Sequence, residues 1–273
     1  MVEKNSLIKK IEEIYSEKFL HETCFVTPVE YHGFLCVAIC ADDNGCYVTM
    51  ESDSGFDIFD AHYLYPMKRA FVQKVADKFR IDYLEGRGYY LPIESLSELE
   101  IKQKLGRFAT FMDVCALYKY IGYHAFDREV VVKEFGEDYF DKYFSIDNEE
   151  FVDKAVDFAK AKETLLKNDR NGWIDNFVDF QNGFTVETNF YDADNNKITF
   201  SVVNKNGKAC VQVGLNFDKV KMLEKFEDIL ISTLYRYDSK EQCACLYLFE
   251  DDIDAAICYA MIASNYEFFT YEK

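Results

Sequence analysis

The chain has 273 residues, of which 49 are acidic and 31 are basic, giving a formal net charge of −18. Hydrophobic residues make up 49%, with 25 Phe and 20 Tyr, which excludes an acidic disordered tail and allows a sizeable core. The negative charge argues against direct binding of nucleic acid, because phosphates are contacted by Lys and Arg.

The composition also bears on cellular location. The opening residues MVEKNSLIKKIEEIYSEKF contain no continuous apolar stretch of the signal-peptide kind. A run of about 18 apolar residues, as a membrane span requires, occurs nowhere. Nine cysteines is an odd number for a disulfide framework. We therefore expect a cytoplasmic protein with reduced thiols.

Helical and strand patterns alternate through the first part of the chain. Apolar spacing predicts a helix over 2–20, followed by strands at 25–31, 34–41 and 46–51. Asn44-Gly45 predicts a tight hairpin between the last two strands. A helix at about 66–80, a hairpin at 81–92 and a long helix to about 121 follow. Ser95 and Glu98 form a capping-box pattern that would open the long helix.

The middle of the chain, 127–170, reads as helical and acidic. Apolar residues at helical spacing predict a buried stripe there that includes Phe151, Val152, Ala155, Phe158 and Leu165. This stretch is the predicted connector between two domains.

The last part returns to strand patterns. Strands are predicted at 184–190, 197–203 and 208–215, with Asn206-Gly207 turning the last pair. A helix at 218–235, a strand at 243–249, a helix at 251–264 and a strand at 266–271 complete the chain. We predict an α+β fold with two small, mainly antiparallel sheets, each packed with helices. The predicted parts are an N-terminal domain 1–126, a helical acidic connector 127–172 and a C-terminal domain 173–273.

Short motifs in both halves resemble a two-domain bacterial and phage family. In the first half they are Thr27-Pro28, the strand around Val37–Ile39, Gly45–Thr49 and Asp53-Ser54-Gly55-Phe56. This half is similar to the domain of unknown function eighteen-twenty-eight, although Glu51-Ser52 stands where two acids are more usual. Gly183-Phe184, the strand at 198–203 and the elements from Cys243 resemble the partner domain, eighteen-twenty-nine. The family has no assigned activity, so the resemblance implies a fold and no chemistry.

Acidic residues after the third strand raise the question of a metal-dependent nuclease. Glu51, Asp53, Asp57 and Asp60 lie close together in sequence, and their oxygens would suit Mg²⁺ or Ca²⁺. A turn in which Asp53 bonds its own backbone and Gly55 takes positive φ explains them better. The acid-x-Lys matches of a restriction-type nuclease begin at Glu100, in a predicted helix, and at Asp238, in a predicted loop.

Other metal patterns are incomplete. Asp192–Lys197 begins like a calcium loop, but Lys197 replaces the required glycine and Val203 the required glutamate, which predicts a hairpin turn. Cys243 and Cys245 fall on one face of a predicted strand, but no second pair completes a zinc knuckle. We therefore interpret them as core thiols and predict no metal, cofactor or catalytic residue.

The acidic surface remains as the candidate site. Aromatic residues interleave with acids in the connector, a composition typical of protein interfaces. The predicted partner-binding residues are Glu137, Asp138, Tyr139, Asp141, Tyr143, Asp147, Glu149, Glu150 and Asp153. A second acidic patch comprises Glu250, Asp251, Asp252 and Asp254, where a helix start also favours negative charge.

These features favour a cytosolic, non-enzymatic interaction module with a basic protein partner. Proteins whose working surfaces are basic are chiefly those that hold DNA or RNA, so a phage or mobile-element inhibitor of a CRISPR or restriction effector is the concrete hypothesis. The alternatives are a divergent metal-dependent nuclease using Glu51, Asp53 and Asp57, and a structural or dimerisation module whose acidity maintains solubility.

Overall fold

The fold was analysed in a computed structural model of the chain. It describes residues 3–15, 24–31, 35–42, 45–51, 69–85, 87–122, 150–169, 172–214, 235–238, 240–247 and 252–269. Contacts divide the chain into two compact units. Unit 1 holds Met1–Ala116, Asn171–Trp173 and Asn189–Lys197; unit 2 holds Leu117–Arg170, Ile174–Thr188 and Ile198–Lys273.

The structure confirms the predicted α+β class, with two separate sheets and helices between them along the chain. Every strand pair whose register is described is antiparallel. None of the helices within the described ranges is long and apolar enough to cross a membrane.

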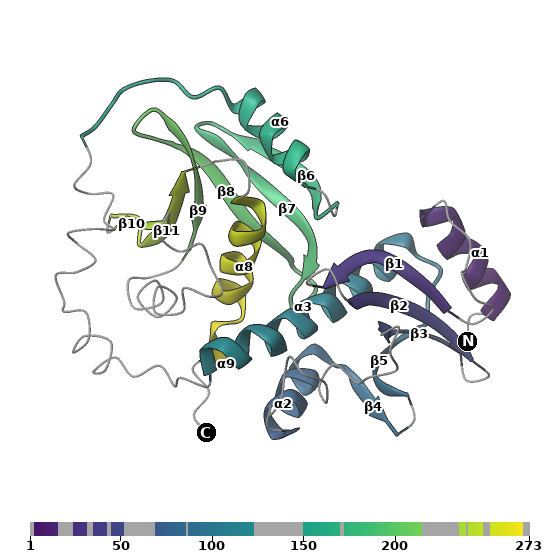
Figure 1. Cartoon of the computed structure of the whole chain (residues 1–273). Helices are drawn as coiled ribbons and strands as arrows, with labels where there is room; N and C mark the ends of the chain where they lie inside the picture. Colours follow the sequence, from purple (N-terminus) through teal and green to yellow (C-terminus); the bar gives the residue numbers. More distant parts are fainter. Residues whose placement is uncertain are drawn as a thin grey trace. The chain divides into compact units, whose positions relative to one another are not determined.

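The first sheet has five strands in the order β1-β2-β3-β5-β4 (Figure 1). They are β1 (Cys24–Tyr31), β2 (Leu35–Asp42), β3 (Gly45–Glu51), β4 (Asp82–Leu84) and β5 (Gly88–Ile93). Gly45 at the predicted Asn-Gly hairpin has φ +120, a conformation that glycine adopts readily because it has no Cβ. Val37, Ile39 and Val48 are fully buried, which places the core of unit 1 on one face of this sheet.

Three helices accompany the first sheet: α1 (Lys4–Tyr15), α2 (Arg69–Phe79) and α3 (Glu98–Gly122). Phe79 of α2 and Phe111 of α3 meet with their ring centroids 6.5 Å apart. The cap of α3 lies two residues later than predicted, because Ser97 Oγ, not Ser95, accepts the N–H of Glu100. Residues 105–112 of α3 are all buried, including the polar Arg107 and Thr110.

The second sheet has six strands in the order β10-β11-β9-β8-β7-β6. They are β6 (Ile174–Phe180), β7 (Gly183–Tyr191), β8 (Lys197–Lys205), β9 (Lys208–Val213), β10 (Tyr235–Asp238) and β11 (Cys243–Tyr247). The sequence patterns did not predict β6 or β10, and the helix predicted to end at 235 is wrong at Tyr235, which begins β10. The rest of that predicted helix lies outside the described residues.

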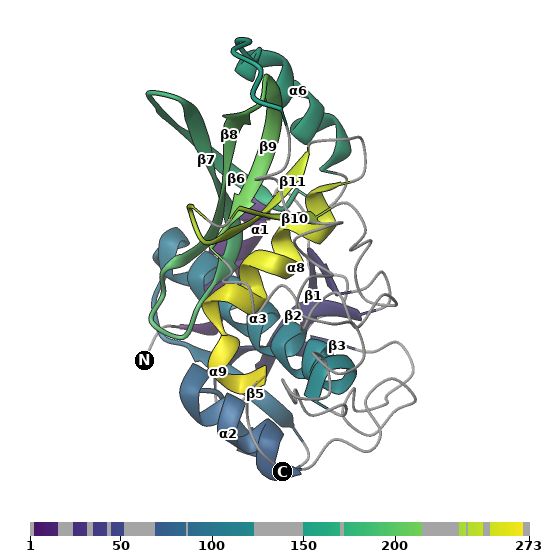
Figure 2. The ribbon, with the colours of Figure 1, turned by 90° about the vertical axis from the view of Figure 1, so that its left-hand side faces the viewer.

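Helices α6 (Phe158–Asn168), α8 (Asp252–Ser264) and α9 (Tyr266–Phe269) belong to unit 2. Figures 1 and 2 both place α8 beside β9. The terminal strand predicted at 266–271 is wrong, because the chain continues as α9. Asn265, buried at the junction, donates its N–H and its side-chain amide to the carbonyl of Met261, and Phe268 is buried beyond it.

The connector prediction is wrong over 150–157, which is neither helix nor strand. The Asp157 carboxylate accepts the N–H of Lys160 at 3.0 Å and caps α6, so the helix begins only at Phe158. Phe151, Val152 and Ala155 are exposed instead of forming a buried stripe, whereas Leu165 is buried as predicted. Residues 127–149 lie outside the described residues.

Candidate functional site

The structure covers only part of the predicted acidic surface. Glu150 and Asp153 are exposed, and the other predicted partner-binding residues, between 137 and 149, lie outside the described ranges. Asp252 begins α8 and Asp254 lies in its first turn, whereas Glu250 and Asp251 are not described. The assignment of these residues to a partner surface stays a prediction.

The segment 150–157 contacts the β8–β9 turn at Lys154. Asn204 donates its side-chain amide to the carbonyl of Lys154 at 2.9 Å, and Lys154 N–H bonds the carbonyl of Val152. The Lys154 side chain also lies so near Gly207 that a Cβ added there would be 2.8 Å from Lys154 Cβ. These contacts hold the chain at Lys154, and Asp157 caps α6, whereas the residues at 151–153 are exposed.

Apolar and acidic side chains alternate at the exposed end of this segment. Phe151 is 78% exposed and Val152 is 48% exposed, and they stand between Glu150 and Asp153. A phenyl ring left largely in water contributes nothing to the core, whereas in a complex it could bury most of its apolar surface.

The α6 helix lies alongside β6 and β7 next to this segment in the chain (Figure 1). Lys162 reaches over the rings of Phe177 and Phe184 and pairs with Asp179 at 2.5 Å. Phe158 meets the Phe184 ring edge-on at 6.0 Å. The ammonium of Lys162 is therefore engaged within the fold.

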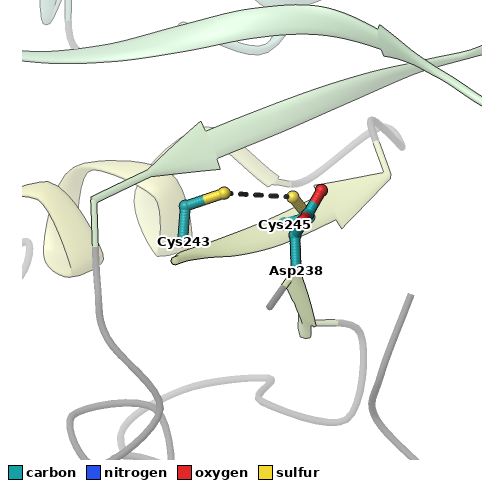
Figure 3. Close-up of side chains that lie close together, drawn as sticks. All are labelled: Asp238, Cys243 and Cys245. Carbon is teal, nitrogen blue, oxygen red and sulfur yellow. Dashed lines mark hydrogen bonds between the residues drawn. The ribbon is translucent and has the colours of Figure 1, made fainter. Parts of the chain in front are cut away.

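A second group of chemically active side chains gathers where β10, β11 and β9 pair. Cys243 and Cys245 project from one face of β11, as predicted, with their sulfurs 3.7 Å apart (Figure 3). Asp238 ends β10 directly opposite Cys243, and Cys210 of β9 opposes Tyr247. Asp238, Cys243 and Cys245 are 5%, 4% and 1% exposed, and their ligand atoms lie within 4.8 Å of one another.

Asp238 is bonded through both carboxylate oxygens. Its Oδ1 accepts the N–H groups of Lys240 and Glu241, each at 3.0 Å, and its Oδ2 accepts the Lys205 ammonium at 2.7 Å. Burial alone would raise the pKa of Asp238, but the Lys205 and backbone hydrogen bonds outweigh it and lower that pKa. The carboxylate is therefore ionised and held in place.

The thiols are mutual hydrogen-bond partners in a dry environment. The contact with Cys245, followed by burial, raises the pKa of Cys243, and the contact with Cys210 is the largest cause that raises the pKa of Cys245. Val203 packs against the three cysteines. With their pKa values raised, Cys243 and Cys245 are protonated and weakly nucleophilic when no cation is bound, because the thiolate is the nucleophile.

Sequence reasoning identified the Cys243–Cys245 pair but missed Asp238 and Cys210 as its neighbours. Asp238 was assigned to a loop with Lys240, whereas it is the last residue of β10. Strand pairing brings Asp238 and Cys210 next to the cysteine pair, and a local sequence pattern does not predict pairing between distant strands. The alternation within β11 predicts only that Cys243 and Cys245 lie on the same face.

The remaining metal candidates have different outcomes. Asp192 bonds its own turn, accepting the N–H groups of Asp194 and Asn196 at 2.9 and 2.8 Å, which confirms the predicted hairpin turn. Of the nuclease candidates, Glu51 is described only as the last residue of β3, and Asp53, Asp57 and Asp60 lie outside the described residues. That alternative stays a prediction.

The comparisons with known proteins give no match: no family model, no curated protein and no solved structure is similar to this chain. The resemblance to the two domains of unknown function therefore stays a prediction.

Proposed function

We propose that this protein is an acidic interaction module that binds the basic, nucleic-acid-holding surface of a protein partner. Inhibitors of CRISPR or restriction effectors are the concrete form of that activity. The observation that carries the proposal is the segment 150–153, which presents Phe151 and Val152 to solvent between two carboxylates.

Charge supports the same class of partner. A net charge of −18 repels nucleic acid and attracts surfaces rich in Lys and Arg. Long-range attraction of this kind accelerates association and weakens with salt. A basic groove that normally binds phosphates has the positive electrostatic potential that attracts this acidic protein.

The exposed apolar pair, Phe151 and Val152, would supply binding affinity beyond the electrostatic attraction. Interfaces draw most of their affinity from a few buried anchors, chiefly aromatic, surrounded by polar groups that exclude water. Phe151 matches such an anchor because its side chain is 78% exposed between acidic residues, and it lies three residues from Lys154, where Asn204 bonds the chain.

The test uses a panel of purified CRISPR and restriction effectors, each carrying a labelled DNA or RNA ligand. We expect the full-length protein to release the ligand from one member of the panel, with an affinity that falls as salt increases. Phe151→Ala should weaken that effect about tenfold or more. Charge reversal at Glu137, Asp138, Asp141, Glu149 and Glu150 should slow association.

Two matched variants on unit 1 serve as controls. Leu99 is 59% exposed on α3 and Asp82 is exposed on β4. Leu99→Ala therefore matches the loss of an exposed apolar side chain, and Asp82→Lys matches the reversal of an acidic charge, both away from the segment. If these controls weaken binding as much as the segment variants, or if no member of the panel loses its nucleic acid, the proposal is wrong.

A further inference from the structure

We propose that Asp238, Cys243 and Cys245 form a binding site for a thiophilic divalent cation, with Zn²⁺ as the physiological ion. The site lies where β10 and β11 pair in unit 2 and is independent of the proposed partner surface. Its three ligands are the carboxylate of Asp238 and the two sulfurs of β11 (Figure 3).

The spacing of the two sulfurs already suits zinc. Zinc–sulfur bonds of about 2.3 Å at a tetrahedral angle hold two sulfurs roughly 3.8 Å apart. The sulfurs of Cys243 and Cys245 are separated by 3.7 Å. They belong to alternate residues of one strand and point the same way, so a cation can bridge them without a change in the backbone.

The Asp238 carboxylate is positioned to be the third ligand of the cation. Two backbone N–H groups fix Asp238 Oδ1, so the side chain cannot rotate away from the sulfurs. One of its oxygens lies within 4.8 Å of both sulfurs, close enough for one ion to reach all three residues. Mixed sulfur and carboxylate ligands are among those that zinc accepts.

The charges around such an ion would be largely compensated, with Lys205 also pairing with the more exposed Glu241 at 3.1 Å. Two thiolates and one carboxylate around a divalent cation leave a single negative charge, and the Lys205 ammonium lies 2.7 Å from Asp238 Oδ2. Buried charges are tolerated only when they are paired or coordinate a metal. Lys205 thus supplies the compensation that a buried anionic site requires.

Cys210 has a supporting place outside the ligand set. It contacts Cys245 from the neighbouring strand, and its own sulfur also lies 3.5 Å from the carbonyl of Val211. In the metal-free site the Cys245 thiol donates to Cys210 and the Cys210 thiol donates to the Val211 carbonyl. Once a cation replaces the Cys245 proton, the Cys210 thiol can turn to donate to the Cys245 thiolate, and removing such an outer partner lowers metal affinity about 10- to 100-fold. We therefore assign Cys210 a positioning role.

The test is a Co²⁺ titration of the reduced, metal-free, full-length protein. We expect one Co²⁺ per chain, with a sulfur-to-cobalt charge-transfer band in the near ultraviolet and visible bands of a distorted tetrahedral ion. Zn²⁺ should displace the cobalt and should raise the melting temperature, because a ligand that binds only the native state stabilises it.

Variants assign the ligands. Cys243→Ser or Cys245→Ser should abolish the charge-transfer band, Asp238→Asn should weaken binding, and Cys210→Ala should keep the band at an affinity reduced about 10- to 100-fold. Cys40→Ser, which alters a partly exposed thiol on β2, is the matched control and should leave the titration unchanged. Circular dichroism identifies any variant that fails to fold.

Two results would overturn the assignment. One is wild-type protein that shows neither the charge-transfer band nor a Zn²⁺-dependent rise in melting temperature, a result that depends on no variant. The other is a folded Cys243→Ser or Cys245→Ser protein that keeps the wild-type spectrum and affinity.

Discussion

Within the described part of the chain, Asp113 is a carboxyl group whose protonation should affect folding stability. It lies on α3 between the buried Met112 and Val114, and desolvation raises its pKa to about 8. The native state then binds a proton that the unfolded chain has already released above its ordinary pKa of 3.8. Stability should therefore fall as pH rises from about 4 to 8, since the native state binds more protons there.

The substitution Asp113→Asn removes this linkage. Relative to wild type, the variant should gain stability on the order of a few kcal/mol at pH 8 and little at pH 4. Urea denaturation at several pH values measures the difference. Asp82→Asn alters an exposed carboxylate on β4 and should follow the wild-type curve; an unchanged slope in Asp113→Asn would contradict the assignment.

At the same scale, the candidate sites show which residues a sequence can identify. Alternation placed Cys243 and Cys245 on one face, because side-chain direction in a strand is a local property. Asp238 and Cys210 reach the same place through the β10–β11 and β11–β9 registers, which depend on residues distant in the chain. Pairing of that kind leaves no periodic signal.

At the scale of elements, Gly106 marks a close approach between α3 and the end of the β7–β8 hairpin in unit 1. A Cβ there would lie 2.0 Å from the carbonyl oxygen of Asn189 and 2.6 Å from the ring of Tyr191. Helix propensity alone predicts that Gly→Ala stabilises by about 1 kcal/mol. The clash with a backbone carbonyl should reverse that sign.

We expect Gly106→Ala to destabilise the protein by about 3 kcal/mol, as overpacking against backbone does. The midpoint of urea denaturation measures the loss. Gly214 has no atom within 4 Å of an added Cβ, so Gly214→Ala provides the matched control and should change stability little. If Gly106→Ala and Gly214→Ala had equal urea midpoints, the predicted clash between α3 and the hairpin would be contradicted.

The elements that the sequence predicted correctly carry strong local signals. Asn206 and Gly207 have φ +51 and +74, as the Asn-Gly hairpin pattern requires, and Gly45 follows the same rule. The edge strand β6 was missed although Asn182-Gly183 precedes β7, because its exposed residues alternate weakly. The strand predicted at 266–271 is wrong over 266–269, where aromatic residues favour strands locally but the chain forms α9 with Phe268 buried.

At the scale of the whole molecule, the net charge of −18 acts on folding as well as on recognition. Like charges are closer together in a compact protein than in an unfolded chain, so their repulsion destabilises the native state. Salt shortens the range of this repulsion to about 10 Å at 0.1 M, which is less than the width of a domain. Uniform acidity therefore reduces stability while it provides attraction to a basic partner.

Stability should consequently rise with salt at pH 7. We expect the urea midpoint to increase between low ionic strength and about 0.1 M NaCl, where screening takes effect. The control is the same series near the sequence pI of about 4.7, where the net charge vanishes and the salt effect should disappear. A rise of equal size at both pH values would assign the effect to salt acting on apolar surface, because that contribution does not depend on protein charge.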